Sequence, residues 1–141
     1  MTCLHLDDAH RAMIEAACLA ALPDEACGLL IGTAAADRIH VDAVVPAANI
    51  AQERRAGFEL DPAVHFHWLR ATRGTGRAVL GHFHSHPGGA PEPSARDCAQ
   101  ACETGAVWLI QAMRDGRPAG LGAFVAQDGT LAAIPLCGDD A

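Results

Sequence analysis

Histidine, serine and aspartate side chains gather in residues 81–97, GHFHSHPGGAPEPSARD. Side chains alternate between the two faces of a β-strand, so His84 and His86 project to the same face and can converge on one metal ion. The run PGGAPEP then ends the strand, and Ser94 is a favoured N-cap residue for a helix whose first turn contains Asp97. Two imidazoles, one carboxylate and a fourth position for water form the ligand set of a catalytic zinc site, whereas a structural site has four protein ligands.

Some of these residues also have a purely structural interpretation. Ser94 and Asp97 have the spacing of a capping box with Asp in place of Glu, which would make them an ordinary helix N-terminus. His82 lies on the same strand face as the other two histidines, where it would pack or support a ligand. Ser85 points the other way and supplies a supporting hydrogen bond at most. The metal interpretation therefore depends on the whole stretch.

Length and composition narrow the class of protein. The chain has 141 residues, 50% of them hydrophobic, so residues 1–141 are expected to form a single domain with a substantial core. A formal net charge of −7 with only 10 Lys plus Arg argues against nucleic acid as a partner. Because there is no basic, apolar leader and no run of about 18 apolar residues, we expect no membrane partner and a cytoplasmic location.

The 6 cysteines are expected to be reduced thiols, because the sequence has neither an export signal nor a Cys-x-x-Cys pair. Cys98 and Cys102 are four residues apart in an expected helix, so they share a face and are interpreted as small core residues. Cys27 would need a nearby base to act as a nucleophile, so a packing role is preferred.

Helices and strands are expected along most of the chain. Helical spacing of apolar residues, N-cap residues and prolines predict helices at 6–22, 62–72 and 94–104. Apolar or alternating segments between turn residues predict strands at 26–33, 38–46, 58–60, 77–86, 106–113, 121–127 and 130–136. Strands 26–33 and 38–46 should pair antiparallel, and the last five residues should fray. The outline is an α+β domain with a mixed or mostly antiparallel sheet and helices packed against it.

A second pair of histidines repeats the spacing of the first. His65 and His67 fall in the helix expected at 62–72, where residues two apart lie roughly 200° apart around the axis. They cannot share a metal ion, and we interpret them as surface or core-edge residues.

The string HSHPGGAPEPSARD resembles the JAMM (MPN-plus) metalloprotease motif, in which His-Ser/Thr-His is followed by seven residues, Ser, two residues and Asp. The order of elements is similar to that of the MPN fold, a curved β-sheet flanked by helices. The resemblance implies that His84, His86 and Asp97 bind one Zn²⁺ ion per chain. The stretch PDEACGLLIG looks like the usual setting of the family's catalytic glutamate, which assigns that role to Glu25.

The resemblance also implies a mechanism. Zinc would polarise the scissile carbonyl and generate a hydroxide nucleophile from water near neutral pH. Glu25 would take the proton of that water and pass it to the leaving amine. Ser94 would donate a hydrogen bond to the oxyanion, a role compatible with its capping position.

The short chain is similar to the small stand-alone prokaryotic members of the family. These cleave after the C-terminal Gly-Gly of ubiquitin-like sulfur-carrier proteins, so the resemblance implies a zinc peptidase with such a protein as its substrate. An alternative is an isopeptidase of a bacterial ubiquitin-like conjugation pathway. A further alternative, a non-catalytic MPN interaction scaffold, is disfavoured because such domains typically lose the ligands that are present here.

Overall fold

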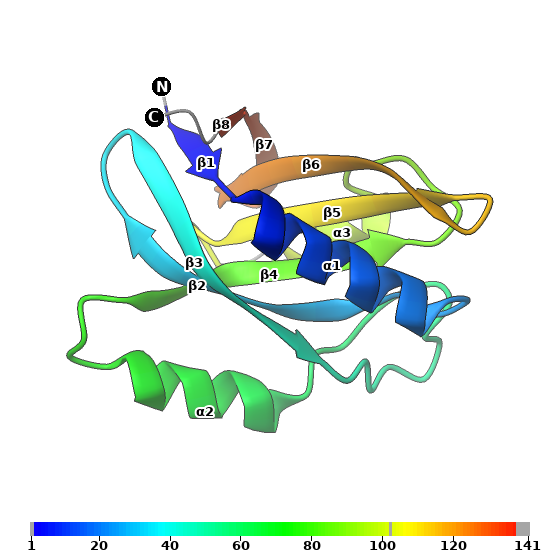
Figure 1. Cartoon of the computed structure of the whole chain (residues 1–141), viewed down its shortest axis with the longest axis horizontal. Helices are drawn as coiled ribbons and strands as arrows, with labels where there is room; N and C mark the ends of the chain where they lie inside the picture. The colour runs from blue at the N-terminus through cyan, green and yellow to red at the C-terminus, as the bar shows by residue number, and fades with distance from the viewer. Residues whose placement is uncertain (1, 102, 138–141) are drawn as a thin grey trace.

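A computed structural model describes residues 2–101 and 103–137 of the chain. Within them, eight strands form one curved sheet in the order β7-β6-β5-β4-β2-β3-β1-β8 (Figure 1). The strands are β1 (Cys3–His5), β2 (Cys27–Ala34), β3 (Arg38–Ala47), β4 (Ala78–His86), β5 (Val107–Arg114), β6 (Arg117–Gln127), β7 (Thr130–Ile134) and β8 (Leu136–Cys137). The helices are α1 (Asp8–Ala21), α2 (Pro62–Thr72) and α3 (Ala95–Gln100). The expected α+β class is confirmed.

The sheet is mixed, and β4 lies in its interior. β2 lies between β3 and β4 and is antiparallel to both, as the sequence predicts for the β2–β3 pair. β4 pairs in parallel with β5, and β5, β6 and β7 continue as antiparallel neighbours. At the other edge, β1 is parallel to both β3 and β8. Because β4 has a strand on each side, the side chains that it presents are held in fixed positions.

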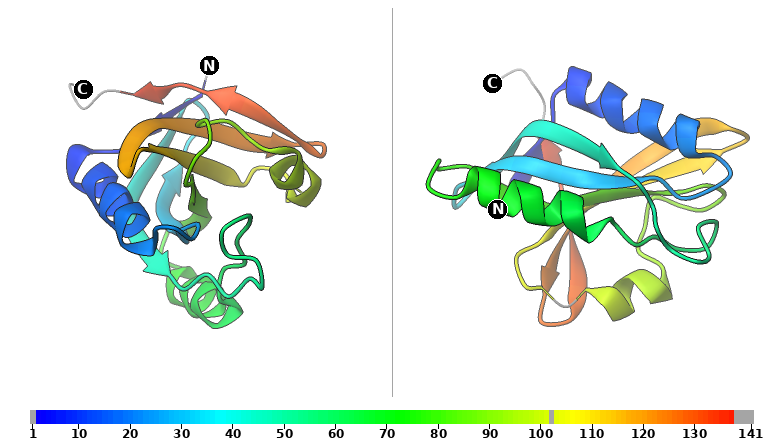
Figure 2. Two further views of the ribbon diagram at one scale, coloured as in Figure 1. Left: turned by 90° about the vertical axis from the view of Figure 1, so that its right-hand side faces the viewer. Right: turned by 90° about the horizontal axis from the view of Figure 1, so that it is seen from below.

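The two faces of β4 have different neighbours. Phe83 belongs to the main core cluster, which also contains Ile14 and Cys18 of α1. Side chains alternate along the strand, so His84 and His86 point to the opposite face. Figure 2 shows α1 and α3 on opposite sides of the sheet, with α3 on the side of these histidines. The alternation expected from the sequence therefore separates the core face from the histidine face.

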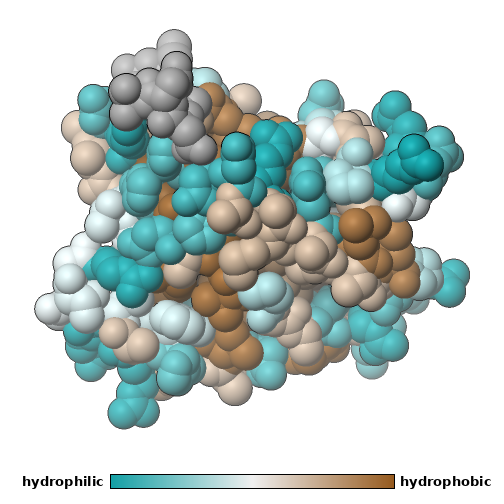
Figure 3. Space-filling model, viewed as in Figure 1, coloured by the Kyte–Doolittle hydropathy of each residue, from teal (hydrophilic) through white to brown (hydrophobic). Residues whose placement is uncertain are grey.

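Helix α1 covers the core face. It begins at an N-cap, where Oδ1 of Asp7 accepts a hydrogen bond from the backbone N–H of His10 at 2.8 Å. Ile14 and Cys18, four residues apart, are buried beneath the helix. The outer side carries Met13 among other apolar residues that gather over α1 on the surface (Figure 3). No helix in the described part of the chain is both long and apolar enough to cross a membrane.

Several predicted boundaries were wrong. The third helix ends at Gln100 rather than at residue 104, because Ala101 leaves the helical conformation (φ −79°, ψ 66°) and its N–H donates to the oxygen of Cys98 as the C-cap. The predicted strand 58–60 is reduced to an isolated bridge between Leu60 and Asn49, since no full strand lies beside it. β1 and β8 were missed, because two- and three-residue strands are too short to show a periodic pattern.

The cysteine prediction also needs correction. Cys3 and Cys137 form a disulfide between β1 and β8, with Cα atoms 5.6 Å apart, so these two are not free thiols. The parallel pairing of the two strands brings them together, and Cys137 is a strand residue rather than part of a frayed tail. Cys98 is exposed instead of buried, because α3 turns that side to solvent. Cys102 lies outside the described residues.

Candidate metal centre

Three side chains from two elements converge at the carboxyl end of β4. His84 and His86 come from β4, and Asp97 comes from the first turn of α3. Nε2 of His84 lies 3.2 Å from Nε2 of His86, and Oδ2 of Asp97 lies 3.3 Å and 3.0 Å from these two nitrogens. Among the described residues, this is the one group of three or more His, Cys, Asp or Glu side chains whose ligand atoms all lie within 4.8 Å of one another.

The separations fit a small tetrahedral cation. Atoms bonded to one Zn²⁺ at about 2.0–2.1 Å with tetrahedral angles lie about 3.3 Å apart. The observed separations range from 3.0 to 3.3 Å. Imidazole nitrogen and carboxylate oxygen are also ligand types that zinc accepts. The group can therefore hold a metal ion through one nitrogen of each histidine and one oxygen of Asp97.

Each of the two imidazoles has a partner on its second nitrogen. Nδ1 of His86 lies 2.9 Å from the backbone oxygen of Ala90. A carbonyl oxygen can only accept, so this Nδ1 carries a proton. In the metal-free protein, burial acts to lower the pKa of His86, but hydrogen bonds with Asp97 and Ala90 outweigh it and raise that pKa, which favours a proton on Nε2 as well. Loss of the Nε2 proton would make the lone pair of this nitrogen available to a metal, with the Nδ1 proton still held by Ala90. Nδ1 of His84 instead lies 3.3 Å from Nε2 of His82. This contact is the kind of support for a ligand that the sequence analysis considered for His82.

Asp97 is both part of a helix capping box and a candidate metal ligand, the two roles considered for it from the sequence. Its backbone N–H donates to Oγ of Ser94 at 3.0 Å, and its Oδ2 accepts from the backbone N–H of Ser94 at 2.9 Å, which makes a capping box. The same Oδ2 faces both histidines. Burial acts to raise the pKa of Asp97, but hydrogen bonds with His84 and His86 outweigh it and hold that pKa well below its usual range. The helix cap thus fixes an ionised carboxylate beside the imidazoles.

Glu25 reaches this site across the β2–β4 pair. The backbone N–H of Ser85 donates to the oxygen of Ala26 at 3.1 Å, which extends the register of the two strands by one pair. Glu25 immediately precedes this contact, and its carboxyl group interacts electrostatically with both His86 and Asp97. The Glu25 residue is only 8% exposed, and burial raises its pKa to about 7, with a smaller lowering from His86. A carboxyl group with this pKa can accept and release a proton near neutral pH.

Ser85 makes the supporting hydrogen bond that the sequence allowed. It is fully buried, and its Oγ accepts from the backbone N–H of Ala26 at 2.8 Å. Burial raises the pKa of the Cys18 thiol to about 11, and a hydrogen bond with Ser85 opposes this rise. The serine between the two candidate ligands therefore ties the residue next to Glu25 to β4. No local pattern could reveal this contact, because it depends on which strands pair.

Residues 7–123 match the family described as prokaryotic homologs of the JAB domain. The chain belongs to this family. Among curated proteins, it is similar to desampylase of Haloferax volcanii, with 41% identity over 95 residues. That alignment covers 67% of this chain and 66% of the relative, so the chain spans just under two thirds of the relative's length.

Solved structures share the fold. A solution structure of a protein from Desulfitobacterium hafniense has a TM-score of 0.82 at 29% identity and covers 95% of this chain and 91% of its own. A protein from Salinibacter ruber has a TM-score of 0.64 at 28% identity, with coverage of 100% and 94%. A JAB1/MPN domain protein from Archaeoglobus fulgidus has a TM-score of 0.56 at 17% identity over 98% of both chains, which supports the fold alone. The resemblance to the prokaryotic JAB/MPN family is confirmed.

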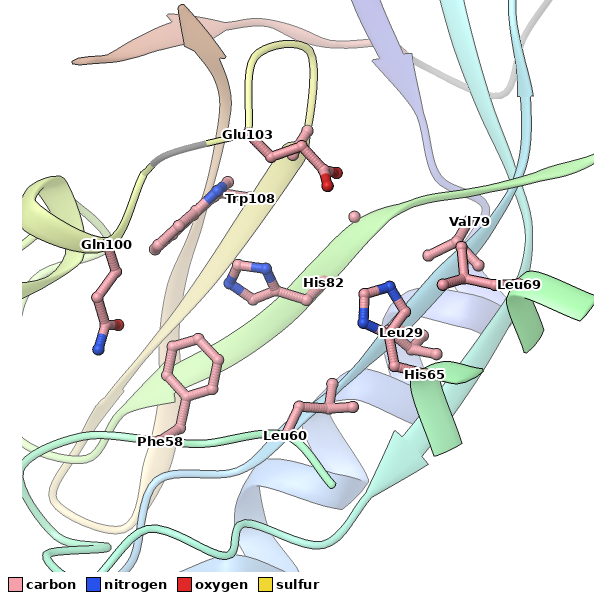
Figure 4. A pocket seen from close by; sticks show the side chains of 12 residues that line it. Leu29, Phe58, Leu60, His65, Leu69, Val79, His82, Gln100, Glu103 and Trp108 are labelled. Atoms are coloured by element: carbon pink, nitrogen blue, oxygen red, sulfur yellow. The ribbon is translucent and has the colours of Figure 1, made fainter. Parts of the chain in front are cut away.

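A mainly apolar pocket lies beside the candidate metal centre of this JAB-family chain. It has a volume of about 350 Å³ and is bounded by α2, β4 and the segment before β5, with Leu60, Leu69 and Trp108 in its wall (Figure 4). Phe58 also lines it and stacks on the ring of His84, with centroids 4.5 Å apart and planes 19° apart. Sequence reasoning missed Phe58, because an irregular segment gives no periodic signal.

The remaining candidates stay outside the centre. His65 and His67 are both exposed on α2 and do not join the metal group, as helix geometry predicts. His65 lines the apolar pocket, whereas His67 packs edge-on against Trp68 with ring centroids 5.5 Å apart. Burial, reinforced by the nearby Glu25, raises the pKa of Cys27 to about 12. The Cys27 thiol therefore stays protonated, which agrees with a packing role.

Proposed function

We propose that the protein is a zinc-dependent hydrolase that cleaves the peptide or isopeptide bond after the C-terminal Gly-Gly of a small ubiquitin-like protein. In this proposal, His84, His86 and Asp97 bind the zinc ion. Glu25 is the general base, and Ser94 donates a hydrogen bond to the substrate. The observation that carries the proposal is the convergence of three ligand atoms 3.0 to 3.3 Å apart, with the buried carboxyl group of Glu25 close enough to interact electrostatically with two of these residues.

The chain's own groups supply the proton transfers. When bound, zinc acts as a Lewis acid that polarises the scissile carbonyl and lowers the pKa of water. Glu25 accepts a proton from the attacking water and delivers it to the leaving amine, and its pKa of about 7 suits both steps at neutral pH. The Ser94 hydroxyl accepts from the backbone N–H of Asp97, so its own O–H remains available to donate to the developing oxyanion.

The proposed substrate class is inferred from the similarity of this chain to known proteins. The name of the curated relative, desampylase, refers to removal of a SAMP, a ubiquitin-like modifier, and this favours an isopeptide bond. The resemblance to small stand-alone JAMM proteins favours a sulfur-carrier protein with a short C-terminal extension. Both substrates would present the same Gly-Gly end to the same residues. A non-catalytic scaffold would not need the three ligands and a buried Glu25, so we do not favour it.

Metal removal and reconstitution test the proposal. Treatment with a chelator should abolish cleavage of a ubiquitin-like protein carrying a linear extension after Gly-Gly, and one equivalent of Zn²⁺ should restore it. Equal cleavage by metal-free protein would refute the zinc mechanism. Parallel assays with an isopeptide-linked conjugate distinguish the two substrate classes, because the preferred bond should be cleaved with the higher kcat/KM.

A further inference from the structure

The two candidate histidine ligands differ in what holds their second nitrogen. A metal-binding imidazole usually donates its other N–H to a carboxylate, a backbone carbonyl or water. His86 follows this rule through the backbone oxygen of Ala90 at 2.9 Å. His84 does not, because its Nδ1 faces Nε2 of His82 at 3.3 Å. A carbonyl can only accept, whereas an imidazole nitrogen can donate or accept, so either His84 or His82 can be the donor in the hydrogen bond between them.

The direction of this bond determines whether His84 can bind a metal. If Nδ1–H of His84 donates to His82, Nε2 of the neutral ring keeps its lone pair and points it toward His86 and Asp97. If His82 donates instead, Nε2 of His84 carries the proton and cannot be a ligand. Since Nε2 of His84 lies 3.2 Å from Nε2 of His86, whose own proton is on Nδ1, only the first arrangement leaves both nitrogens free for an ion.

We propose that His82 is a positioning residue for the metal centre: it accepts the Nδ1–H of His84 and so sets the tautomer and ring orientation of that ligand. This inference rests on the proposed function, because it assumes that His84 binds metal. It adds a residue that is not one of the proposed ligands and does not touch the substrate's reacting atoms.

The surroundings of His82 suit this role. In the sheet, His82 pairs with Leu29 on β2 and with Trp108 on β5, one row away from His84 on the same face. Its ring packs edge-on against Trp108, with centroids 4.4 Å apart and planes 68° apart, and Phe58 lies 4.9 Å away on a tilted plane. These aromatic contacts restrict rotation of the imidazole and keep Nε2 directed at His84.

His82 also belongs to the wall of the apolar pocket (Figure 4). A group bound in that pocket would therefore contact His82, which is itself hydrogen-bonded to the candidate ligand His84. The pocket and the metal centre share this side chain, so changes at His82 should be detected at the metal even without substrate.

Zinc titration of three variants tests the inference. His82→Phe keeps an aromatic ring between Phe58 and Trp108 but removes both nitrogens, and we expect Zn²⁺ to bind about 10–100-fold more weakly, the usual cost of losing such a partner. His82→Gln retains an acceptor near the position of Nε2 and should recover most of the affinity. His67→Phe is the matched control, because His67 is an exposed histidine of α2 that packs against Trp68 and does not line this pocket, and its affinity should equal that of the wild type. Each metal-free protein is titrated with Zn²⁺ against a chromophoric chelator.

Two results would overturn the role of His82. One is wild-type zinc affinity in His82→Phe. The other is an equal loss in the Phe and Gln variants, which would indicate packing rather than a hydrogen bond. In both cases the wild type still binds zinc, so the proposed function stands. If the wild type itself binds no Zn²⁺, the proposed function and this inference fail together.

A spectroscopic measurement does not depend on the variants being folded. In zinc-loaded wild-type protein with ¹⁵N-labelled histidine, His84 should coordinate through Nε2 and carry a slowly exchanging proton on Nδ1. A coupling from that proton to Nε2 of His82 would identify the acceptor. A His84 ring without a proton on Nδ1 would exclude the proposed arrangement.

Discussion

The carboxyl group of Glu25 interacts electrostatically with His86, although the two residues belong to separate parts of the chain that the β2–β4 pairing brings together. The backbone of Glu25 is held from both sides: its N–H donates to the oxygen of Arg54 at 2.7 Å, and its own oxygen accepts from Nδ2 of Asn49 at 2.9 Å. The loop after β3 and the serine in β4 therefore set the position of this carboxyl group. A carboxyl group fixed in this way can take up the proposed role of base without a large rearrangement.

Replacing Glu25 with Gln should separate metal binding from turnover. The amide keeps the size of the side chain but cannot accept a proton, so kcat should fall about 10²–10⁴-fold while zinc content stays unchanged. Metal analysis and steady-state kinetics on a Gly-Gly-linked substrate measure the two effects. Glu53→Gln is the control, because Glu53 is an exposed glutamate in the neighbouring loop and should leave kcat unaltered. Full activity in Glu25→Gln would show that another group is the base.

The buried Glu25 should also make the metal-free protein less stable as pH rises. Burial raises its pKa from 4.5 to about 7, so between these values the folded state holds a proton that the unfolded state has lost. The free energy of unfolding of the metal-free protein therefore decreases as pH rises through this range. Relative to Glu25→Gln, the wild type should lose on the order of 2 kcal/mol between pH 5 and pH 8, discounted for residual solvent contact. Urea unfolding in the presence of a chelator measures the difference, and parallel pH profiles for the two proteins would contradict it.

Substitutions at Ser94 should distinguish its role as the N-cap of α3 from its proposed role as a hydrogen-bond donor to the oxyanion. Ser94→Ala removes the hydroxyl and weakens the N-cap, at a cost of about 1 kcal/mol, whereas Gly at an N-cap costs only a few tenths. If the hydroxyl stabilises an oxyanion, both variants should lose about 10²–10³-fold in kcat. Unfolding and kinetic measurements on the pair give the answer. An active Ser94→Gly variant would leave Ser94 with the capping role alone.

Gly81 should tolerate no side chain, because β4 and β5 approach closely there. A Cβ atom at this position would lie 1.9 Å from the backbone oxygen of Val107 and 2.6 Å from its nitrogen. Gly81→Ala must push the strands apart and should cost more than about 4 kcal/mol. Gly88→Ala is the control, since nothing lies within 4 Å of its added Cβ. Thermal unfolding compares the two, and similar melting temperatures would contradict this account of the β4–β5 contact.

Local patterns were enough to predict much of the site. The alternation of a strand places His84 and His86 on one face, and the spacing of Ser94 and Asp97 predicts the capping box that the structure contains. The same kind of reasoning correctly kept His65 off the metal group, because residues of a helix diverge by about 100° per position. These features depend on neighbours within a few residues, which the sequence displays directly.

Contacts between segments far apart in the sequence could not be predicted from local patterns. The resemblance named Glu25, but only the pairing of β2 with β4 brings it near His86. The contact between His82 and His84 and the disulfide between Cys3 and Cys137 likewise required coordinates. By itself the sequence determined which residues could bind a metal and which elements carry them. The tertiary structure decided which side chains meet, because strand order and register depend on burial summed over the whole sheet rather than on any local pattern.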